Sequence, residues 1–555
     1  MSYYEDRPWN KNYPAGIPAN IDPDKYENLL VFYEEVFDKH ADKVAYTYMG
    51  KELTFKDVNI LSRNFAAYLH SRGLEPGDRI ALMMPNILQY PIVMYGALRA
   101  GLIIVNTNPL YTPREMLHQF TDSGAKAVVI AELFASKLEE ILDQTQIKVI
   151  MTASMGEMLS PVKGALVNFV VRKVKKMVPK YTLPNVTTVK EALKMGKRFE
   201  INPFESRPND TVLLQYTGGT TGVSKGAELT NRNLIANMMQ IEAWMQGMLM
   251  RGNETALCPL PLYHIFAFSV NAMALFSLGI NNVLIPNARD IKGLIKEWKK
   301  HKVSIFDGVN TLFNALVHHP DFGSIDFSTL KITVGGGMAV QNVVAEEWYR
   351  ITNNVLSEGY GMTEASPVVT VNPVDGTARI GTIGLPVPST LVRVANDQDE
   401  EVPVGESGEL QVKGPQVMKG YYNRPDETAK TIRNGWLCTG DIGYMDEDGF
   451  FTLIDRKKDM ILVSGFNVFP NEIEDVIAQH PKVLEVAAIG VPDEKSGEVV
   501  KVCVVKKDKS LDEKELIDYC RTQLTGYKVP KHVEFRDDLP KSNVGKILRR
   551  KLREE

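Results

Sequence analysis

Early in the chain, continuous apolar runs alternate with longer segments of helical length. The runs DRIALMM, LIIVNTNP and KAVVIA are typical of buried strands. Between them lie ILQYPIVMYGALRAG and PREMLHQFTDSG, whose length and apolar spacing indicate helices. This order of strand, helix, strand, helix and strand predicts parallel strands joined by right-handed crossovers.

The same alternation returns in the middle of the chain. TVLLQY predicts a strand, and a glycine-rich loop leads from it towards Thr230, a residue type that caps helix N-termini. The helix expected after this cap places Leu234, Met238, Ile241 and Met245 on one face. Further buried strands and a β-rich section are expected at NVLIP, VSIFDGV, KITVGGG and GELQVKGPQVMKGYYN. We therefore predict a large, multi-lobed N-terminal α/β domain with parallel sheets.

The character of the chain changes near residue 455. Beyond it the elements are shorter and more charged, as in NEIEDVIAQH and LDEKELIDYC. About 100 residues remain, which is within the usual size of a domain. The expected organisation is an N-terminal domain at residues 1–454, a hinge at 455–458 and a small α+β C-terminal domain at 459–555.

Charge and composition restrict the kinds of partner and the location that the sequence predicts. The 64 basic and 68 acidic residues nearly cancel, so no long-range field favours nucleic acid, and none is expected as a partner. The apolar stretch 265–280 is shorter than the roughly 20 residues that span a bilayer, and we expect a buried helix there. The N-terminus lacks the pattern of a signal peptide, so a cytoplasmic location is expected.

One segment departs from neutral charge. Residues 158–190 contain seven basic side chains and no acidic one, and GALVNFVVRKVKKMVPK can form a basic amphipathic helix. Such a helix could rest on the anionic inner face of a membrane, making the protein peripheral there. A solvated helix face is the alternative.

The loop YTGGTTGVSKG is built like a phosphate cradle. Glycines let backbone N–H groups converge on an anion, and hydroxyls and a lysine add donors and charge. The spacing differs from GxxxxGK[ST], which disfavours a P-loop NTPase, and a tight structural turn remains an alternative. The candidate phosphate-binding residues are Thr217, Gly218, Gly219, Thr220, Thr221, Gly222 and Lys225.

Two later segments add nucleotide chemistry. GYGMTEASP supplies Tyr360, suited to stacking on a base, and Glu364, whose carboxylate could hold Mg²⁺ against phosphate oxygens. WLCTGDIGY places Asp441 in a turn, where it could accept both hydroxyls of a ribose. Each has a structural alternative: a core tyrosine, a helix N-terminal charge and a turn former.

Together with PKSNVGKILRRKLRE near the C-terminus, these segments resemble the adenylate-forming acyl-CoA synthetase superfamily over essentially the whole chain. LQYTGGTTG, PLYHIFAF and DRKKDMI make the chain most similar to bacterial long-chain fatty acid CoA ligases. The resemblance implies a mobile C-terminal lid and three cofactors or cosubstrates: ATP, Mg²⁺ and coenzyme A. It also implies two steps, in which a carboxylate first forms acyl-AMP and the thiol of coenzyme A then displaces AMP.

The resemblance also implies residue roles. Thr217 and Glu364 would lie near Mg²⁺, and Thr363 would touch the α-phosphate. The remaining nucleotide residues would be Gly335, Gly336, Gly337 and Tyr360 around adenine, and Asp441 and Arg456 at the ribose.

The catalytic and gating roles follow from the same resemblance. Lys546 would bridge the carboxylate and the α-phosphate as charge builds there. Lys458 would be the pivot, Gly465 would line a pantetheine channel, His264 would neighbour the substrate carboxylate and Phe268 would gate the acyl pocket. A turn glycine and a core histidine are the structural alternatives for two of these residues.

The leading hypothesis is thus a long-chain fatty acid CoA ligase. The nearest alternatives are a medium-chain or aryl-CoA ligase and a loader of acyl groups onto a carrier protein. A non-catalytic protein of fatty-acid binding or uptake and a luciferase-like monooxygenase belong to other classes. The sequence leaves open the acyl chain length and whether the protein forms a homodimer.

Overall fold

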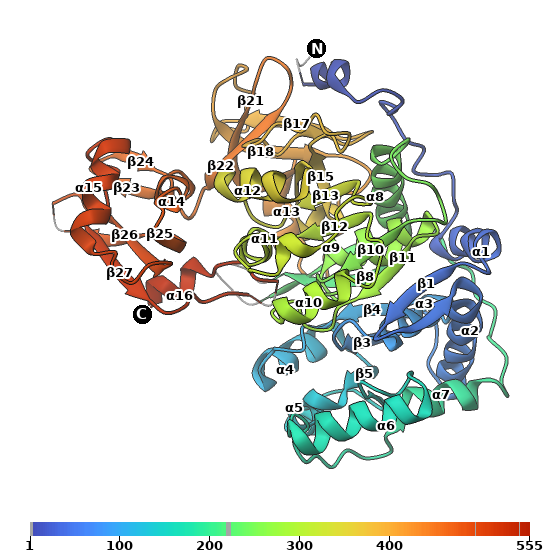
Figure 1. Cartoon of the computed structure of the whole chain (residues 1–555). Helices are drawn as coiled ribbons and strands as arrows, with labels where there is room; N and C mark the ends of the chain where they lie inside the picture. The colour runs from blue at the N-terminus through green and yellow to red at the C-terminus, as the bar shows by residue number, and fades with distance from the viewer. Residues whose placement is uncertain (1–3, 218–223, 494, 543, 555) are drawn as a thin grey trace.

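A computed structural model describes residues 4–217, 224–493, 495–542 and 544–554 of the chain. Within these residues the strands form four sheets, two of which are large and build the body (Figure 1). A third, antiparallel sheet completes the body, and the fourth belongs to the smaller C-terminal domain. The predicted fold class, a multi-lobed α/β body with parallel sheets and a β-rich section plus a small α+β domain, is confirmed.

The first large sheet contains the predicted crossover units. Its strand order is β19-β9-β8-β4-β3-β5-β6-β7, and β3 pairs in parallel with both β4 and β5. All five residues of β5 are buried, as expected for a strand covered on both faces. The strands are β3 (Arg79–Met83), β4 (Ile103–Asn106), β5 (Ala127–Ala131), β6 (Val149–Ala153), β7 (Thr187–Thr188), β8 (Thr211–Thr217), β9 (Lys225–Thr230) and β19 (Gly420–Tyr421).

The second large sheet has the order β16-β15-β14-β13-β12-β10-β11-β1-β2. Its centre is parallel, and its two ends carry antiparallel pairs. The strands are β1 (Val44–Tyr48), β2 (Lys51–Thr54), β10 (Thr255–Cys258), β11 (Asn281–Leu284), β12 (Ile305–Gly308), β13 (Ile332–Gly335), β14 (Leu356–Gly361), β15 (Val368–Val371) and β16 (Leu385–Pro386).

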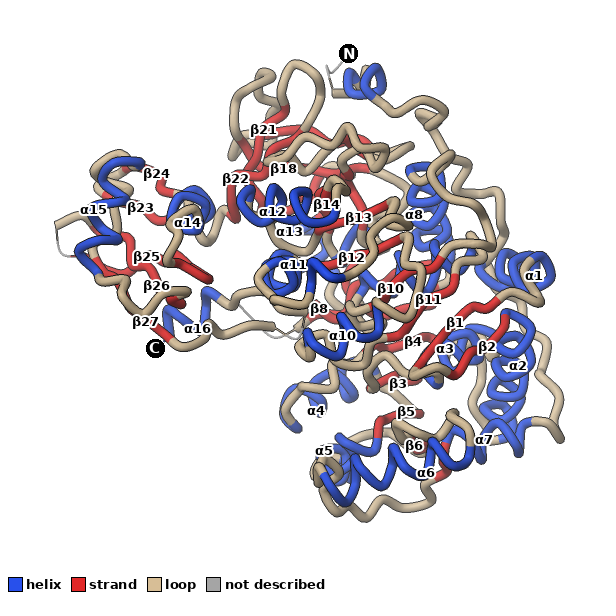
Figure 2. The backbone as a smooth tube through the Cα atoms, in the orientation of Figure 1, coloured by secondary structure: helices blue, strands red, loops and turns tan. Residues whose placement is uncertain are grey.

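Helices cover and separate these sheets (Figure 2). The helix predicted after Thr230 is present as α8, which begins with a capping box between Thr230 and Asn233. It packs on the helical segment after residue 265 and on β9. The body helices are α1 (Leu29–Lys39), α2 (Phe55–Ser71), α3 (Gln89–Arg99), α4 (Pro113–Ser123), α5 (Ala135–Glu139), α6 (Pro161–Phe169), α7 (Val189–Gly196), α8 (Asn231–Trp244), α10 (Ile291–Trp298), α11 (Asn310–Val317), α12 (Asn342–Thr352) and α13 (Pro425–Thr431).

The apolar stretch 265–280 is buried, as predicted, but it is not a regular α-helix. A short turn, α9 (Ile265–Ala267), leads into a π-helical segment, η5 (Phe268–Leu275), in which every residue is buried. Since this segment is buried on all sides, its apolar pattern carries no period that could separate an α-helix from a π-helix. Across the described ranges, no helix has the length and apolar character needed to cross a membrane.

The β-rich section forms the third sheet, in the order β17-β18-β21-β20 with β22 on β21. All of its pairs are antiparallel. The strands are β17 (Leu391–Ala395), β18 (Gly408–Lys413), β20 (Ile432–Arg433), β21 (Trp436–Met445) and β22 (Phe451–Arg456).

The C-terminal domain lies to one side of the body and has its own hydrophobic cluster, which includes Ile473, Val486 and Leu516. The change from one cluster to the other falls between β22 and the next strand. The boundary at 455–458 lies there and stays a prediction. The elements are β23 (Ile461–Val463), β24 (Phe466–Val468), β25 (Val483–Asp493), β26 (Gly497–Lys506), β27 (His532–Arg536), α14 (Pro470–Ala478), α15 (Glu513–Gln523) and α16 (Arg549–Glu554).

Candidate active site

A cavity of about 910 Å³ lies between the body and four residues of the C-terminal domain, Ser542, Val544, Lys546 and Leu548. This volume is near the upper end of the range for small-molecule pockets. Its walls bring together twelve of the predicted site residues from distant parts of the chain: Thr217, Lys225, His264, Gly336, Gly337, Tyr360, Thr363, Glu364, Asp441, Arg456, Lys458 and Lys546.

One end of the cavity is organised around a buried carboxylate. The Tyr360 hydroxyl donates to Asp441 Oδ2 at 2.6 Å, and Arg456 Nε lies 3.3 Å from Asp441 Oδ1. Burial raises the pKa of Tyr360 well above its usual value, so the phenol stays protonated and remains a donor. A carboxylate has about four lone-pair sites, and two of them remain for further donors. The arrangement suits the vicinal hydroxyls of a ribose.

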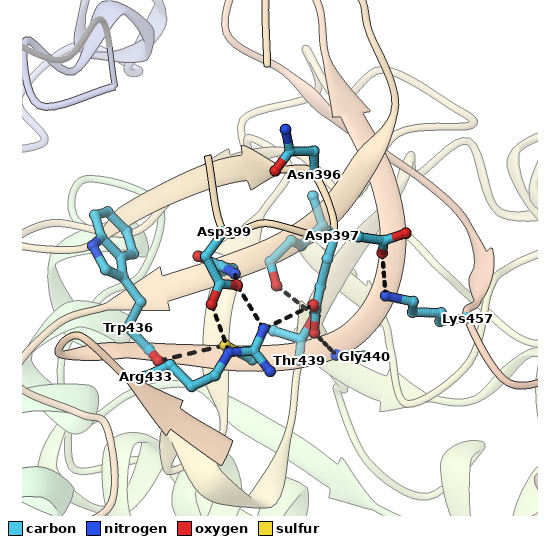
Figure 3. A network of polar contacts seen from close by, with 12 residues as sticks. Asn396, Asp397, Asp399, Arg433, Trp436, Thr439, Gly440 and Lys457 are labelled. Carbon is cyan, nitrogen blue, oxygen red and sulfur yellow. Dashed lines mark hydrogen bonds and ion pairs between the residues drawn. The ribbon is translucent and has the colours of Figure 1, made fainter. Parts of the chain in front are cut away.

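A polar network behind this carboxylate fixes its position (Figure 3). Nε and Nη2 of Arg433 donate to the two carboxylate oxygens of Asp399, at 2.8 and 2.6 Å, in a bidentate pair. Arg433 also lies 3.4 Å from Glu409, whose other carboxylate oxygen accepts the Gly440 N–H at 2.9 Å. Gly440, with φ +72°, directly precedes Asp441 within β21, where the pairing with β18 shifts register. The predicted turn at Asp441 is therefore wrong: the carboxylate is presented by an irregular part of a paired strand, and the network holds that part in place.

β22, the strand that pairs with this part of β21, is held at the same end, next to Arg456. Lys457 Nζ lies 2.6 Å from Asp397, and the Lys457 N–H donates to the Gly440 carbonyl at 3.0 Å (Figure 3). The neighbouring Lys458 lines the cavity, and desolvation together with Arg456 lowers its pKa to about 8. The last two residues of the predicted hinge thus lie at a fixed part of the cavity wall.

The glycines after β13 leave room for a flat ring. Gly336 and Gly337 line the cavity, and a Cβ at Gly336 would lie 3.1 Å from the Phe266 ring and 3.2 Å from the Gly359 carbonyl oxygen. Gly337 has φ +77°, in the region that favours glycine. Gly335 does not line the cavity, since its absent side chain faces packed carbons 2.8 Å away.

The two ends of the glycine-rich loop meet on the cavity wall. Thr217 closes β8, Lys225 opens β9, and the two residues are paired across this hairpin. Lys225 Nζ lies 2.9 Å from Glu427 and 4.5 Å from the centre of the Tyr421 ring. The other candidate phosphate ligands lie outside the described residues: Gly218, Gly219, Thr220, Thr221 and Gly222.

Glu364 is buried in the short turn Thr363–Ala365, at 7% exposure. One of its oxygens accepts the Tyr421 hydroxyl at 2.7 Å. With Thr217, this carboxylate supplies the hard oxygen ligands that Mg²⁺ prefers. In the described part of the chain no group of three or more His, Cys, Asp or Glu side chains could hold a metal alone. The residues fit Mg²⁺ as an ion that takes its remaining ligands from phosphates and water.

Lys546 reaches the same cavity from the C-terminal domain. Its ammonium donates to the Gly337 carbonyl at 3.3 Å, and its N–H donates to Ser542 Oγ at 3.0 Å. The preceding Gly545 carbonyl accepts the Thr311 hydroxyl of α11 at 2.8 Å. Withdrawal from water, together with the positive charge of Arg456, lowers the pKa of Lys546 to about 7. An anionic ligand here would restore the charge on the ammonium.

His264 lies at the junction of the polar and apolar halves of the cavity. Burial, with a contribution from the charge of Lys546, lowers its pKa to about 4, so the imidazole is neutral at pH 7. His264 Nδ1 accepts the Phe266 N–H at 3.3 Å, which leaves the ring proton on Nε2. The side chain can therefore donate one hydrogen bond to a ligand oxygen.

Beyond His264 the cavity becomes apolar. Its walls there come from α8, η5, β15 and the segments next to α8, β15 and β16, and include Ile241, Trp244, Met245, Val270, Val368, Val371, Val374 and Val387. Trp244 Nε1 donates to the Asn372 carbonyl at 3.0 Å, so its ring has a fixed orientation. The sequence pattern placed some of these side chains on one helix face without indicating that they border a cavity.

Besides Gly335, two predicted residues lie away from the cavity. Phe268 opens the π-helix η5 at 1% exposure and does not line the space, so its gating role stays a prediction. Gly465 lies in the turn between β23 and β24 with φ +85°, and no neighbouring atom comes within 4 Å of the position of a Cβ. This arrangement of the domains thus gives Gly465 the geometry of a turn glycine.

Comparison with known proteins follows the same division of the chain. Residues 33–422 match the AMP-binding enzyme family and residues 472–546 its C-terminal domain. A long-chain-fatty-acid–CoA ligase of Escherichia coli O6:H1 is 56% identical over 548 residues, covering 99% of this chain and 98% of the relative. A ligase of the same name from Haemophilus influenzae is 52% identical over 551 residues, with the same coverage.

Among solved structures, an anthranilate CoA ligase in complex with anthranoyl-AMP has a TM-score of 0.85. It is 23% identical, and the alignment covers 96% of this chain and 98% of that one. At this identity the likeness shows the fold: a large N-terminal domain followed by a smaller C-terminal one.

Proposed function

Because the chain belongs to the family of AMP-binding enzymes, we propose that it ligates a long-chain fatty acid to coenzyme A. The reaction consumes ATP, passes through acyl-AMP and releases AMP and pyrophosphate. The names and identities of its relatives support the substrate class, and the cavity supports the chemistry.

The observation that carries the proposal is the continuity of one cavity with two unlike halves. The polar half contains the Tyr360–Asp441–Arg456 group and Lys546, and the apolar half runs along α8 past Trp244. His264 lies between them. A molecule that fills both halves has a nucleotide at one end, an apolar chain at the other and a reacting centre in the middle, as acyl-AMP has.

In the first step a carboxylate oxygen attacks the α-phosphorus of ATP, and the bond to the departing pyrophosphate breaks. Negative charge grows on the oxygens around that phosphorus. The Lys546 ammonium stabilises this charge, since ATP raises the pKa that burial has lowered. The neutral His264 donates to the carboxylate and orients it. Asp441 holds the ribose.

In the second step the thiol of coenzyme A loses its proton to solvent and its sulfur attacks the acyl carbon. The bond from that carbon to the AMP oxygen breaks, and AMP leaves with the electron pair. Lys546 has no role in this step. Pyrophosphate must depart and a thiol must enter where Val544, Lys546 and Leu548 now border the cavity, so we propose that the C-terminal domain turns about a hinge at 455–458. Gly465 would reach the thiol channel only after that rotation.

Mg²⁺ fits this site as a companion of the nucleotide. Thr217 and Glu364 would hold it, and the ion would neutralise phosphate charge when bound. We also propose that the fatty acid is taken from an anionic membrane surface, where an amphiphilic acid accumulates.

The proposal is tested by pyrophosphate release from Mg·ATP with straight-chain acids from acetate to stearate and with aromatic acids, each with and without coenzyme A. Sustained turnover with laurate to stearate that requires coenzyme A is expected. Turnover confined to short or aromatic acids would show that the substrate is not a long-chain fatty acid. Turnover indifferent to coenzyme A would point to another acceptor, such as a carrier protein, and no release with any acid would overturn the enzyme activity.

A further inference from the structure

The helix α6 exposes its apolar side chains instead of burying them. Val162, Leu166 and Phe169 are 83%, 60% and 57% exposed, and their spacing places them on one face of the helix. Val174 and Met177, in and just after the π-helical turn η4 (Val170–Val174), are 62% and 48% exposed. An ordinary surface helix turns such a stripe towards the core.

The opposite face of the helix attaches it to the body through close and polar contacts. Gly164 approaches Gly156 so closely that a Cβ would lie 2.4 Å from the Gly156 carbonyl oxygen. Asn168 Oδ1 accepts the Gly156 N–H at 2.8 Å, and Arg172 pairs with the buried Glu132 at 2.6 Å. Since Gly164, Asn168 and Arg172 are four residues apart, they define the inner face and fix the apolar stripe outward.

Basic side chains surround the stripe. Lys173, Lys175 and Lys176 are exposed beside Val174 and Met177, and no acidic residue occurs from 158 to 190. Lys163 donates to the Met49 carbonyl at the other end of the helix. Exposed apolar residues rimmed by cations complement a surface that is anionic at its boundary and apolar beneath it.

We propose that α6 and η4 form a docking surface for an anionic lipid bilayer, in which Val162, Leu166 and Phe169 enter the acyl region while Lys173, Lys175 and Lys176 contact phosphate headgroups. The helix would lie in the plane of the interface, since it is too short to cross a bilayer. The contact itself is independent of the ligase activity, but its use in collecting fatty acid rests on the proposed function.

The position of the surface allows docking during turnover. α6 runs along the lower edge of the body, and α14, α15 and α16 lie in the C-terminal domain at the left of the view, away from α6 (Figure 1). A rotation of the C-terminal domain therefore leaves the docking surface free.

Co-sedimentation of the full-length protein with vesicles of phosphatidylcholine, with and without phosphatidylglycerol, tests the surface. One variant changes the stripe (Val162→Ser, Leu166→Ser, Phe169→Ser) and a second changes the cations (Lys173→Gln, Lys175→Gln, Lys176→Gln). Arg172 is left intact because its loss would leave the buried Glu132 without its ion-pair partner. The control changes three exposed apolar residues elsewhere, Val343→Ser, Tyr349→Ser and Ile380→Ser.

Wild type and control should bind the anionic vesicles and bind phosphatidylcholine weakly. Each lysine near an anionic surface contributes about fivefold, so the charge variant should lose about 100-fold in partition coefficient. The stripe variant should lose more than about tenfold. Binding of either variant within twofold of the control would overturn the proposal. So would a wild-type dimer in sedimentation that the stripe variant converts to monomer without loss of vesicle binding.

Pyrophosphate release with a soluble acid, decanoate, separates this inference from the proposed function. All three variants should keep wild-type turnover without vesicles, since none of the changed residues lines the cavity. A wild type that binds vesicles but turns over no acid would refute the function and leave the docking surface standing.

Discussion

The two walls of the cavity are built differently. On the body side, Tyr360, Asp441 and Arg456 belong to paired strands and are backed by the Arg433 network. On the other side, residues 544–548 approach the body through single contacts, such as those from Thr311 to Gly545 and from Lys546 to Gly337. Each such bond contributes about 1 kcal/mol.

This difference separates binding from activation. A nucleotide site needs donors and acceptors that stay in place, and strands with a buried polar network provide them. A group needed for only one of two steps has to leave afterwards. Because its segment is held by few contacts, moving it away costs little free energy. The central claim is therefore that the body holds the nucleotide throughout, whereas docking of Lys546 serves the first step only.

Lys546→Ala should have the largest effect. Removing the charge that stabilises the first transition state should slow acyl-AMP formation by about 1,000-fold. Thioester formation from supplied acyl-AMP should stay within about threefold of wild type. Rapid-quench measurement of both half-reactions checks this, with the exposed Lys551→Ala as the matched control. Equal losses in the two steps would end the assignment of Lys546 to the first.

Asp441→Ala should weaken the binding of ATP by the body side of the cavity. Hydrogen bonds to a buried charge contribute about 1.5–3 kcal/mol, so the KM for ATP should rise by about 10- to 100-fold. Both half-reactions should suffer, since both use the nucleotide. Asp397→Ala, at an exposed ion pair with Lys457, is the control and should change KM by less than about threefold. Similar KM values for the two variants would contradict the ribose site.

The pH profile of the first step should report Lys546. Its pKa of about 7 means that the free enzyme loses the required ammonium as the pH rises through 7. kcat/KM for adenylation should therefore be full below pH 7 and fall about tenfold per unit well above it. Because bound phosphates raise the pKa, the decline in kcat should begin at higher pH. Lys546→Arg stays charged, so persistence of the same alkaline decline in that variant would refute the assignment.

Thr311→Val should have the smallest effect. It removes the hydroxyl that donates to Gly545, with little change in volume. A loss of about 1 kcal/mol in docking should slow adenylation by about fivefold. Thioester formation from acyl-AMP should be unchanged, and thermal unfolding shows whether the variant is otherwise intact. A slower second step would mean that Thr311 acts on the body itself.

Much of the fold could be predicted from the chain, for identifiable reasons. β3, β4 and β5 are apolar runs of strand length separated by helical segments, and few folds other than a parallel sheet with crossover helices fit this pattern. The Thr230 cap marks the start of α8. The π-helix η5 could not be predicted, because a segment buried on every side has no polar face to reveal its period.

The site could be predicted where its residues cluster in short segments, and the structure brings most of those segments to one cavity. Contacts between segments that are far apart in the sequence could not be predicted, because neither segment carries a local pattern that indicates its partner. Tyr421 is 57 residues from Glu364 and Thr311 is 234 residues from Gly545. The apolar half of the cavity was equally hidden, since a side chain lining a cavity and one filling a core have the same polarity.

The most direct test of the central claim is to lock the docked segment in place. A Cβ at Gly545 would lie 3.9 Å from the Thr311 Cβ, a separation that suits a disulfide, although a cysteine at φ +83° carries a strain of about 1 kcal/mol. The oxidised Thr311→Cys, Gly545→Cys enzyme should form one equivalent of acyl-AMP from ATP and palmitate, then yield no thioester with coenzyme A until the bond is reduced. Thr311→Cys alone is the control, and a non-reducing gel after the reaction confirms that the bond survived coenzyme A. Thioester formation at the wild-type rate with the bond intact would show that Lys546 need not leave, and would contradict the account.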